Sequence, residues 1–227
     1  MYLSYCFTDS NGIYNHSDGN VIVNKAQITA SIGIYNNGVG SINIGDENST
    51  SCGTISITGN GVYNAITGVV TVNSCAGGEL KIEVSAQSFA PYVIRNYNGG
   101  SIVVNGGEIS LSANSLIDSS VVCNTQDHPG NITINGGKIR IYNANYYHAA
   151  LTGGHGNVVI TGGEIIDETY YDYSSAVSVG GSGSLTLGSK DDSVYDKPLI
   201  KSENKGVDVT SGATFNFYDG VIKGKVA

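Results

Sequence analysis

The stretch that decides the fold is SIVVNGGEI at residues 101–109, which returns as NITINGGKI at residues 131–139. Each copy holds an apolar–polar–apolar triplet, a glycine doublet and a further isoleucine. Alternate residues of an extended strand point to the same side, so each triplet places two apolar side chains together. A glycine doublet allows a sharp corner with positive φ. Both copies therefore predict two short strands joined by a corner.

The triplet recurs along the whole chain and forms what we call the first column. Successive triplets begin 21, 28, 32, 30, 26, 27 and 30 residues apart. A period in this range is typical of solenoids, in which each repeat packs only on its neighbours. The first column consists of residues 21–23, 42–44, 70–72, 102–104, 132–134, 158–160, 185–187 and 215–217.

Two more apolar columns accompany the first. Three strands in each turn of roughly 27 residues indicate a three-sided coil whose stacked copies share one core. The sides are longer and less regular than those of left-handed hexapeptide helices, so we predict an all-β, right-handed parallel β-helix of about eight coils. The second column follows each triplet and consists of Ile28, Ile55, Ile82, Ile109, Ile139, Ile165, Ile200 and Ile222. The third column precedes each triplet and consists of Ile13, Ile34, Val62, Ile94, Ile117, Ala150, Val177 and Val207.

The composition agrees with many short strands and tight turns. The 227 residues include 32 Gly and 15 Tyr but only 3 Pro and no Trp. Such a mixture favours strands joined by turns, and the length suits one domain over residues 1–227. Residues 41–78 also resemble residues 184–220, which we interpret as a duplication within one solenoid.

The charge and hydropathy patterns exclude two classes of partner. The net charge is -8, and Arg95 and Arg140 are the two arginines of the chain. Binding to a phosphate backbone needs clustered Lys and Arg, so we expect no nucleic-acid partner. No apolar run approaches the ~20 residues of a membrane-spanning helix, so we expect no membrane insertion. The opening residues MYLSYCFTDSNG lack the basic and long apolar regions of a signal peptide.

Several motifs support a family resemblance. GIYN followed by GSINIG, the ITINGGKI corners and the closing GATFNFYDGVIKGK resemble repetitive cell-surface proteins of Gram-positive bacteria, which are pectate-lyase-like β-helices used as stalks or adhesins. The resemblance covers nearly the whole chain and implies secretion and surface display. It brings no catalytic residues, because the shared motifs are corners and core strands. Since the sequence holds neither a signal peptide nor a wall anchor, we expect a fragment of a larger surface protein.

One group of tyrosines is expected to stack along the outside of the solenoid. Tyr14, Tyr35 and Tyr63 each follow an inward residue of the third column, and Arg95 and Asp118 extend their file. The stacked rings are either a platform for sugar rings or surface residues with good packing between strands.

A second group of tyrosines lies in two loops that follow the second column. Equivalent placement in neighbouring coils predicts that these loops meet, with Asp167, Glu168 and Asp172 adding acceptors. Tyrosine offers rigid, amphipathic contact area, so this group is the preferred ligand contact, and its alternative is loop packing over the corner. The group consists of Tyr142, Tyr146 and Tyr147 with His148 in the first loop, and Tyr170, Tyr171 and Tyr173 in the second.

Asparagines follow the first group of tyrosines at equivalent positions. They are Asn15, Asn36, Asn64 and Asn96. An asparagine side chain both donates and accepts hydrogen bonds, so a stack of them can satisfy backbone groups from coil to coil. We predict a structural asparagine ladder at a turn.

Acidic residues after the glycine corners raise the possibility of glycoside cleavage. Glu79, Glu108, Lys138 and Glu164 are expected to form one column that reads acid, acid, base, acid. Glycoside hydrolysis needs two carboxyl groups about 5–10 Å apart, which adjacent coils can supply. The alternative is a solvated ladder that Lys138 partly neutralises. We assign no catalytic residue.

Metal and cofactor sites are not indicated. The histidines His16, His128, His148 and His155 have no partner at ligand spacing, so we expect no metal and no cofactor. Two acidic pairs, Asp46 with Glu47 and Asp191 with Asp192, are either weak calcium sites or solvated turns.

The four cysteines leave two interpretations open. Cys6, Cys52, Cys75 and Cys123 fit no zinc pattern. Cys52 and Cys75 lie one coil apart in the predicted register, so they form either a disulfide or two buried thiols.

These observations favour a non-enzymatic, extracellular surface or adhesin-type solenoid segment that recognises carbohydrate or a host or cell-surface ligand. A polysaccharide lyase or glycoside hydrolase of the β-helix class is the first alternative. A phage-spike-like fibre is the second, and it predicts a trimer. Fold alone does not choose among these, because β-helices host all three.

Overall fold

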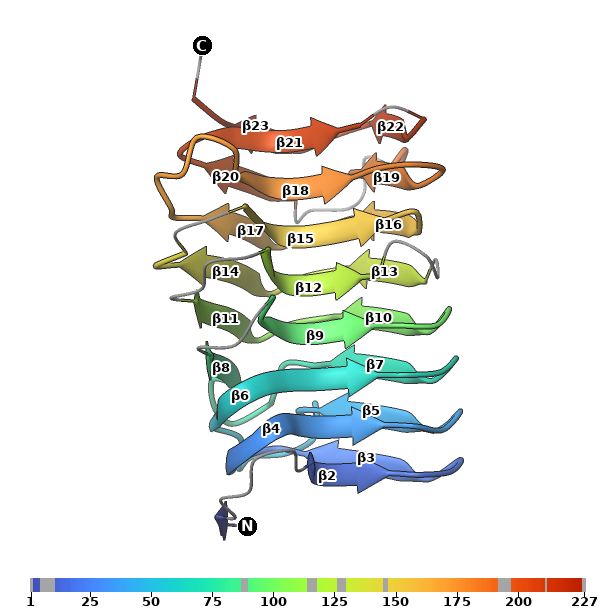
Figure 1. Cartoon of the computed structure of the whole chain (residues 1–227), viewed down its shortest axis with the longest axis vertical. Coiled ribbons are helices and arrows are strands. Elements are labelled where there is room, and N and C mark those ends of the chain that lie inside the picture. The colour runs from blue at the N-terminus through green and yellow to red at the C-terminus, as the bar shows by residue number, and fades with distance from the viewer. Residues whose placement is uncertain are drawn as a thin grey trace.

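The computed structural model describes residues 2–4, 11–86, 90–113, 118–125, 130–144, 147–191, 197–210 and 212–225. It is a β-solenoid whose strands pair in parallel with the strands of neighbouring coils and stack along the long axis (Figure 1). No helix occurs among these residues, and so none that could span a membrane. The strands form two sheets, one of eight strands and one of fifteen.

The first column builds the eight-stranded sheet, which confirms that column. Ile42 pairs with Val70, and Val70 pairs with Ile102. All three side chains are fully buried, and burying a side chain of this size stabilises the fold by about 1.5–3 kcal/mol. The strands are β3 (Asn20–Val23), β5 (Ser41–Ile44), β7 (Val69–Val72), β10 (Ser101–Val104), β13 (Asn131–Ile134), β16 (Asn157–Ile160), β19 (Ser184–Leu187) and β22 (Thr214–Phe217).

The fifteen-stranded sheet carries the other two columns on two arms. Two long strands, β4 (Ala26–Asn36) and β6 (Thr54–Asn64), run through both arms and join them, and β1 (Tyr2–Ser4) pairs with β4. The second-column arm continues through β8 (Lys81–Ala86), β11 (Glu108–Ala113), β14 (Lys138–Tyr142), β17 (Glu164–Asp167), β20 (Leu199–Ser202) and β23 (Val221–Lys223). The third-column arm contains β2 (Asn11–Asn15), β9 (Tyr92–Asn96), β12 (Ser119–Asn124), β15 (His148–Gly154), β18 (Ser175–Val179) and β21 (Lys205–Val209).

The second column is confirmed except at its first member. The seven isoleucines from Ile55 to Ile222 share one register. Ile28 was misplaced, because it pairs with Ile57 while Ala26 pairs with Ile55. The reason is a shorter corner after β3, which brings the chain to the second side two residues earlier.

The third column is confirmed at both ends and shifted in the middle. Ile13, Ile34, Val62 and Ile94 lie in one register, as do Val177 and Val207. Between them the register passes through Val122 and Leu151, so the assignment of Ala150 was wrong by one residue. Ile117 lies outside the described residues. The strands from β9 to β18 each bury two consecutive apolar residues at this level, so alternation alone does not decide which of the two belongs to the column. The pairs are Val93 with Ile94, Val121 with Val122, Ala150 with Leu151 and Ala176 with Val177.

The glycine doublets form the predicted corners. Gly107, Gly137 and Gly163, the second glycine of each doublet, have φ values of +79°, +83° and +82°. A Cβ atom on Gly137 would lie 2.7 Å from the Gly107 carbonyl oxygen of the coil below. Glycine is therefore required both by the backbone conformation and by the stacking of one corner on the next.

The asparagine ladder is confirmed and is one residue longer than predicted. The Asn15 side chain donates to Asn36 at 2.9 Å, and Asn36 donates to Asn64 at 2.8 Å. Asn64 then donates to Asn96 at 2.9 Å, and Asn96 donates to Asn124 at 3.1 Å. Each of these side chains also donates to the carbonyl oxygen of a glycine in the following turn. The ladder is buried and satisfies backbone groups in five successive coils.

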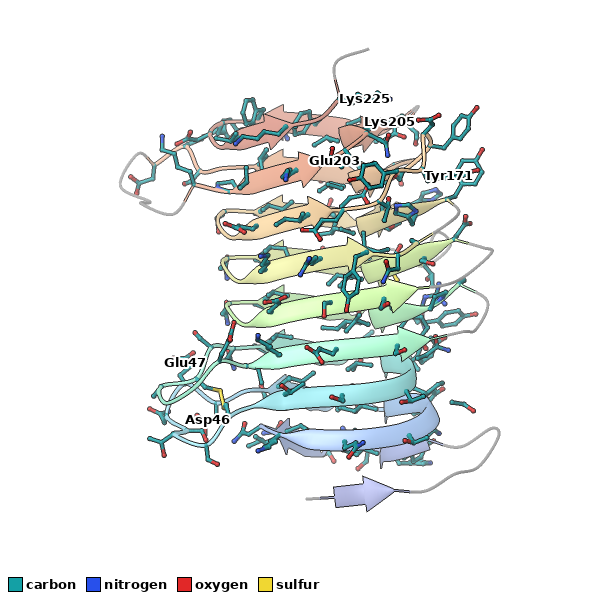
Figure 2. All side chains as sticks on the ribbon, turned by 90° about the vertical axis from the view of Figure 1, so that its left-hand side faces the viewer. Asp46, Glu47, Tyr171, Glu203, Lys205 and Lys225 are labelled. Atoms are coloured by element: carbon teal, nitrogen blue, oxygen red, sulfur yellow. A yellow bond between two sulfur atoms is a disulfide. The ribbon has the colours of Figure 1, made fainter. Side chains whose placement is uncertain are left out.

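A disulfide joins the loops of two neighbouring coils. Cys52 precedes β6, Cys75 follows β7, and the two sulfur atoms are bonded across 23 residues of sequence. Figure 2 shows this bond in yellow near the loop that carries Asp46 and Glu47. The structure thus selects the disulfide over two buried thiols. Cys123 is a free, buried cysteine, and Cys6 lies outside the described residues.

Removing the disulfide is expected to lower the free energy of unfolding by about 3 kcal/mol, because a bond across a loop of this length restricts the unfolded chain. The measurement is urea unfolding of the protein and of a Cys52→Ser/Cys75→Ser variant, each with and without reductant. Reductant should destabilise the protein and leave the variant unchanged. Equal stability of the oxidised protein and the variant would contradict a stabilising role.

The right-handed sense of the solenoid and the count of about eight coils remain predictions from the sequence. The strand register establishes the parallel stacking and the shared core. That core contains members of all three columns in one continuous cluster of buried aliphatic side chains from β3 to β20.

Candidate ligand-binding groove

The outer surface of the third-column arm carries two files of outward side chains. In the file that begins with Tyr14, the register runs through Tyr35, Tyr63 and Arg95. It then continues through Cys123, Thr152, Ser178 and Asp208. Asp118, which was expected to extend this file, instead precedes β12 and is exposed at its side. The parallel file consists of Tyr92, Ser120, Ala149, Ser175 and Lys205.

The first group of tyrosines stacks as predicted. The ring centroids of Tyr14 and Tyr35 lie 5.4 Å apart and those of Tyr35 and Tyr63 lie 5.3 Å apart, each pair at an angle of 19° between planes. Tyr92 and Tyr97 extend the stack beyond Tyr63. Burial and the neighbouring Tyr35 raise the pKa of Tyr63 to about 12, so its hydroxyl stays neutral at physiological pH.

The geometry of this stack determines which parts of the tyrosine rings are accessible to a ligand. Neighbouring rings cover each other's faces, so a molecule approaching from outside meets ring edges and hydroxyl groups. A sugar ring that binds by aromatic stacking needs an open ring face. The stack of Tyr14, Tyr35 and Tyr63 therefore fits packing between strands better than a platform for sugar rings.

A groove begins where the tyrosine stack ends. Its floor lies on β12, β15 and β18, where the outward side chains are small, and its volume is about 550 Å³. The Arg95 side chain stands at one end, and Lys205 and Asp208 stand at the other, with 2.8 Å between the Lys205 amine and the Asp208 carboxylate. The floor consists of Ser120, Cys123, Ala149, Thr152, Ser175 and Ser178.

Tyrosines from the two predicted loops form one wall of the groove. Tyr147 contacts Tyr171 with ring centroids 5.8 Å apart and Tyr173 with centroids 5.5 Å apart. The loops therefore meet, as the sequence predicted. Tyr147 and Tyr173 line the groove and are 45% and 60% exposed, so their rings are open to a ligand. Figure 2 places Tyr171 and Lys205 near the same end of the solenoid.

The other members of this group lie elsewhere. Tyr170 is 86% exposed and lines a separate hollow of about 380 Å³ with Tyr171 and Glu168. Tyr142 packs under the Arg140 guanidinium, 5.2 Å from its carbon to the ring centroid. Tyr146 lies outside the described residues. The groove thus uses Tyr147 and Tyr173 from the predicted patch.

Asp167 was wrongly expected to act as a surface acceptor. Its side chain is fully buried and lies 3.1 Å from Nε2 of His148, which is also fully buried and also contacts the Thr169 hydroxyl. The Ser174 and Ser202 hydroxyls donate to the other Asp167 oxygen at 2.8 and 2.9 Å. Burial raises the pKa of Asp167, but hydrogen bonds from His148, Thr169 and Ser174 outweigh it and hold the pKa below its usual range.

The sequence analysis did not predict the His148–Asp167 pair, although the position of Asp167 in the strand indicated that its side chain is buried. Asp167 comes two residues after the inward Ile165, and its register neighbour is the buried Ile141. Alternation therefore places a carboxylate in a file of core side chains, where it needs buried partners. Asp167 accepts hydrogen bonds from Thr169 and Ser174, which flank the segment that carries Tyr171 and Tyr173, so the pair ties down both ends of that segment.

The remaining acidic residues of the patch are paired or remote. Glu168 forms an ion pair with Arg140, and Asp172 lies 4.0 Å from the Lys225 amine. Neither residue lines the groove. The floor of the groove thus relies on hydroxyl groups and backbone for polar contacts. One such contact is the 2.8 Å hydrogen bond between the Ser120 and Thr152 hydroxyls.

The predicted column of glutamates was wrong at Glu79. Register pairs Lys81, not Glu79, with Glu108, and Glu108 with Lys138, which in turn pairs with Glu164. The column therefore alternates base and acid, because the corner before β8 places Lys81 at the first position of that strand. In this column Lys138 separates Glu108 from Glu164, so no two of its carboxylates lie on adjacent strands.

No group of three or more His, Cys, Asp or Glu side chains suited to holding a metal ion occurs among the residues that the structure describes. Asp46 accepts a hydrogen bond from the Asn48 backbone N–H at 2.9 Å, which is the geometry of a turn. The Ser189 hydroxyl accepts a hydrogen bond from the Asp191 backbone N–H at 3.1 Å in a similar exposed turn, and Asp192 lies outside the described residues. His16 packs against the Tyr14 ring.

Comparison of the chain with protein-family models, with curated proteins and with solved structures finds no match. The β-solenoid fold is therefore established by the strand register. The interpretation of function depends on the groove and its lining.

Proposed function

We propose that this chain is a non-enzymatic segment of an extracellular surface or adhesin-type protein, and that it binds a saccharide chain in the groove over β12, β15 and β18. The observation that carries the proposal is the groove itself. Small side chains on three successive coils leave a trough along the solenoid, and the exposed rings of Tyr147 and Tyr173 form its wall.

The chemistry of the groove suits a saccharide. Successive strands lie about 4.8 Å apart, so groups on the floor repeat on the scale of one sugar unit in an extended chain. The hydroxyls of Ser120, Thr152 and Ser178 supply donors and acceptors for sugar hydroxyls. Tyrosine rings offer apolar faces to the C–H groups of a sugar.

Two observations support the extracellular, non-enzymatic part of the proposal. The bond between Cys52 and Cys75 is typical of proteins in oxidising compartments, and the motif resemblance points to surface proteins of Gram-positive bacteria. The alternation of Lys81, Glu108, Lys138 and Glu164 places a lysine beside each carboxylate of that column, which favours a charge-balanced ladder over a pair of catalytic acids.

A glycan array followed by titration calorimetry on any positive saccharide tests this proposal. Tyr173→Ala should weaken binding roughly two- to tenfold, because an aromatic contact contributes about 0.5–1.5 kcal/mol. Ser178→Trp should abolish binding by filling the trough. Tyr170→Ala is the matched control, since Tyr170 is exposed on the same loop but does not line the groove.

Three outcomes would contradict the proposal. They are the absence of binding to every saccharide, equal weakening by Tyr170→Ala and Tyr173→Ala, and cleavage of the bound saccharide. Cleavage is detected as new reducing or unsaturated ends and would overturn the non-enzymatic part alone.

A further inference from the structure

Arg95 is an unusual residue at the end of the groove. Its side chain is half-buried, and its Nε–H is buried without a hydrogen-bond partner. The guanidinium carbon lies 4.6 Å from the centroid of the Tyr92 ring, which holds the group over that ring. Burying part of a cation and leaving one of its donors without a hydrogen bond raises the free energy of the folded protein, and a bound anionic group would lower it again.

The two arginines of the chain differ in their partners. Arg140 contacts Glu168 and lies 4.0 Å from Glu108, so its charge is balanced. Among the described residues, no carboxylate forms an ion pair with Arg95. The Cys123 thiol forms a side-chain hydrogen bond with Arg95, and burial raises the pKa of this thiol, so it is neutral at physiological pH and does not balance the charge.

The other charged residues that line the groove do not neutralise the positive charge of Arg95. Lys205 and Asp208 neutralise each other at the far end, four strands or about 19 Å away. Asp118 also lines the groove but is exposed, so water screens its charge. The positive charge at the Tyr92 end is therefore available to an anionic group in the groove.

We infer that Arg95 forms an oxyanion subsite, so that the groove selects saccharides bearing carboxylate or sulfate groups over neutral ones. This inference rests on the proposed function and names its ligand class. A guanidinium presents a planar fork of N–H donors that matches both oxyanions. The Tyr92 ring holds the guanidinium at the end of the groove, and the Ser120 and Thr152 hydroxyls lie on the adjoining floor for the neighbouring sugar hydroxyls.

Three polymers test the inference: alginate, which carries carboxylates, dextran sulfate, and neutral dextran as the matched control. Binding to either anionic polymer is expected to exceed binding to dextran and to weaken with added salt. Arg95→Gln should weaken anionic binding roughly 10- to 100-fold, the range for a hydrogen bond to a charged group. Arg140→Gln removes the same charge outside the groove and should leave binding unchanged.

Nuclear magnetic resonance provides a readout that requires no variant. The chain has two arginines, so a nitrogen-15 spectrum of arginine Nε–H groups contains two such signals. The Arg95 signal should shift on addition of the anionic polymer while the Arg140 signal stays in place. Alginate and dextran sulfate, used separately, identify which oxyanion is preferred.

The outcomes separate the inference from the proposed function. Equal binding of neutral and anionic polymers that Arg95→Gln does not weaken would overturn the oxyanion subsite. If Ser178→Trp still abolished that binding, the saccharide groove would stand. An Arg95 signal that does not move in the presence of a bound anionic polymer also overturns the subsite. Failure of all three polymers and of a wider glycan array to bind overturns both.

Discussion

Replacing Asn64 by alanine is expected to lower the free energy of unfolding by roughly 4 kcal/mol, because it leaves several buried polar groups unsatisfied. The Asn64 side chain is fully buried in the middle of the asparagine ladder. It donates to the Gly68 carbonyl at 2.7 Å and to Asn96 at 2.9 Å, and it accepts from Asn36 at 2.8 Å. Each of those partners loses a hydrogen bond that water cannot replace. Chemical denaturation measures the effect.

The matched control for this variant is Asn105→Ala. Asn105 also belongs to a hydrogen-bonded file of asparagines, since it donates to Asn73 and accepts from Asn135, both at 2.9 Å. That file is exposed, so water can satisfy the groups left behind, and the expected loss is below about 1 kcal/mol. Equal losses in the two variants would show that burial of the ladder is not what makes it stabilising.

Asp167→Asn is the second substitution with a large expected effect, a loss of about 3–5 kcal/mol at neutral pH. The carboxylate has five hydrogen-bonding contacts in a site with no solvent exposure. They involve His148, Ser174, Ser202, and the hydroxyl and backbone N–H of Thr169. An amide removes the charge and one acceptor. Asp172→Asn is the control, because that carboxylate is 79% exposed and should be dispensable.

The effect of Asp167→Asn should also depend on pH in a defined direction. The pKa of Asp167 is lower in the folded protein than in the unfolded chain, where it is about 3.9. The ionised carboxylate therefore contributes stability that is fully present above pH 4 and is lost as the pH falls through the lower, folded value. The stability gap between protein and variant should therefore be constant above about pH 5 and shrink as the pH falls from 5 toward 3. A gap that stays constant over this range would refute the assignment.

The periodic parts of the fold could be predicted from the sequence because they follow local rules. Alternation placed the first column without error, and the glycine doublets marked corners whose positive φ values the structure confirms. The asparagine ladder and the tyrosine stack were also predictable. Once strands stack in parallel at a constant spacing, equivalent positions must lie above one another.

The errors in the columns arose where that local rule was interrupted. Ile28, Ala150 and Glu79 were each placed by counting along the sequence from a corner or a triplet. A shorter corner before Ala26, two consecutive buried residues in β15, and a corner that ends at Lys81 account for these errors. Turn geometry is set by contacts with the coil below, and the sequence of the turn does not reveal those contacts.

The sequence by itself determined a solenoid with aliphatic columns inside and asparagine and tyrosine files at fixed positions, because spacing along the chain becomes stacking in space. Tertiary structure alone decided which charges pair and where the surface is concave. The groove, the buried His148–Asp167 pair and the unbalanced charge of Arg95 each arise from side chains of separate coils. Concavity and charge balance depend on what neighbouring coils place beside a residue, and that juxtaposition exists only once the coils have stacked.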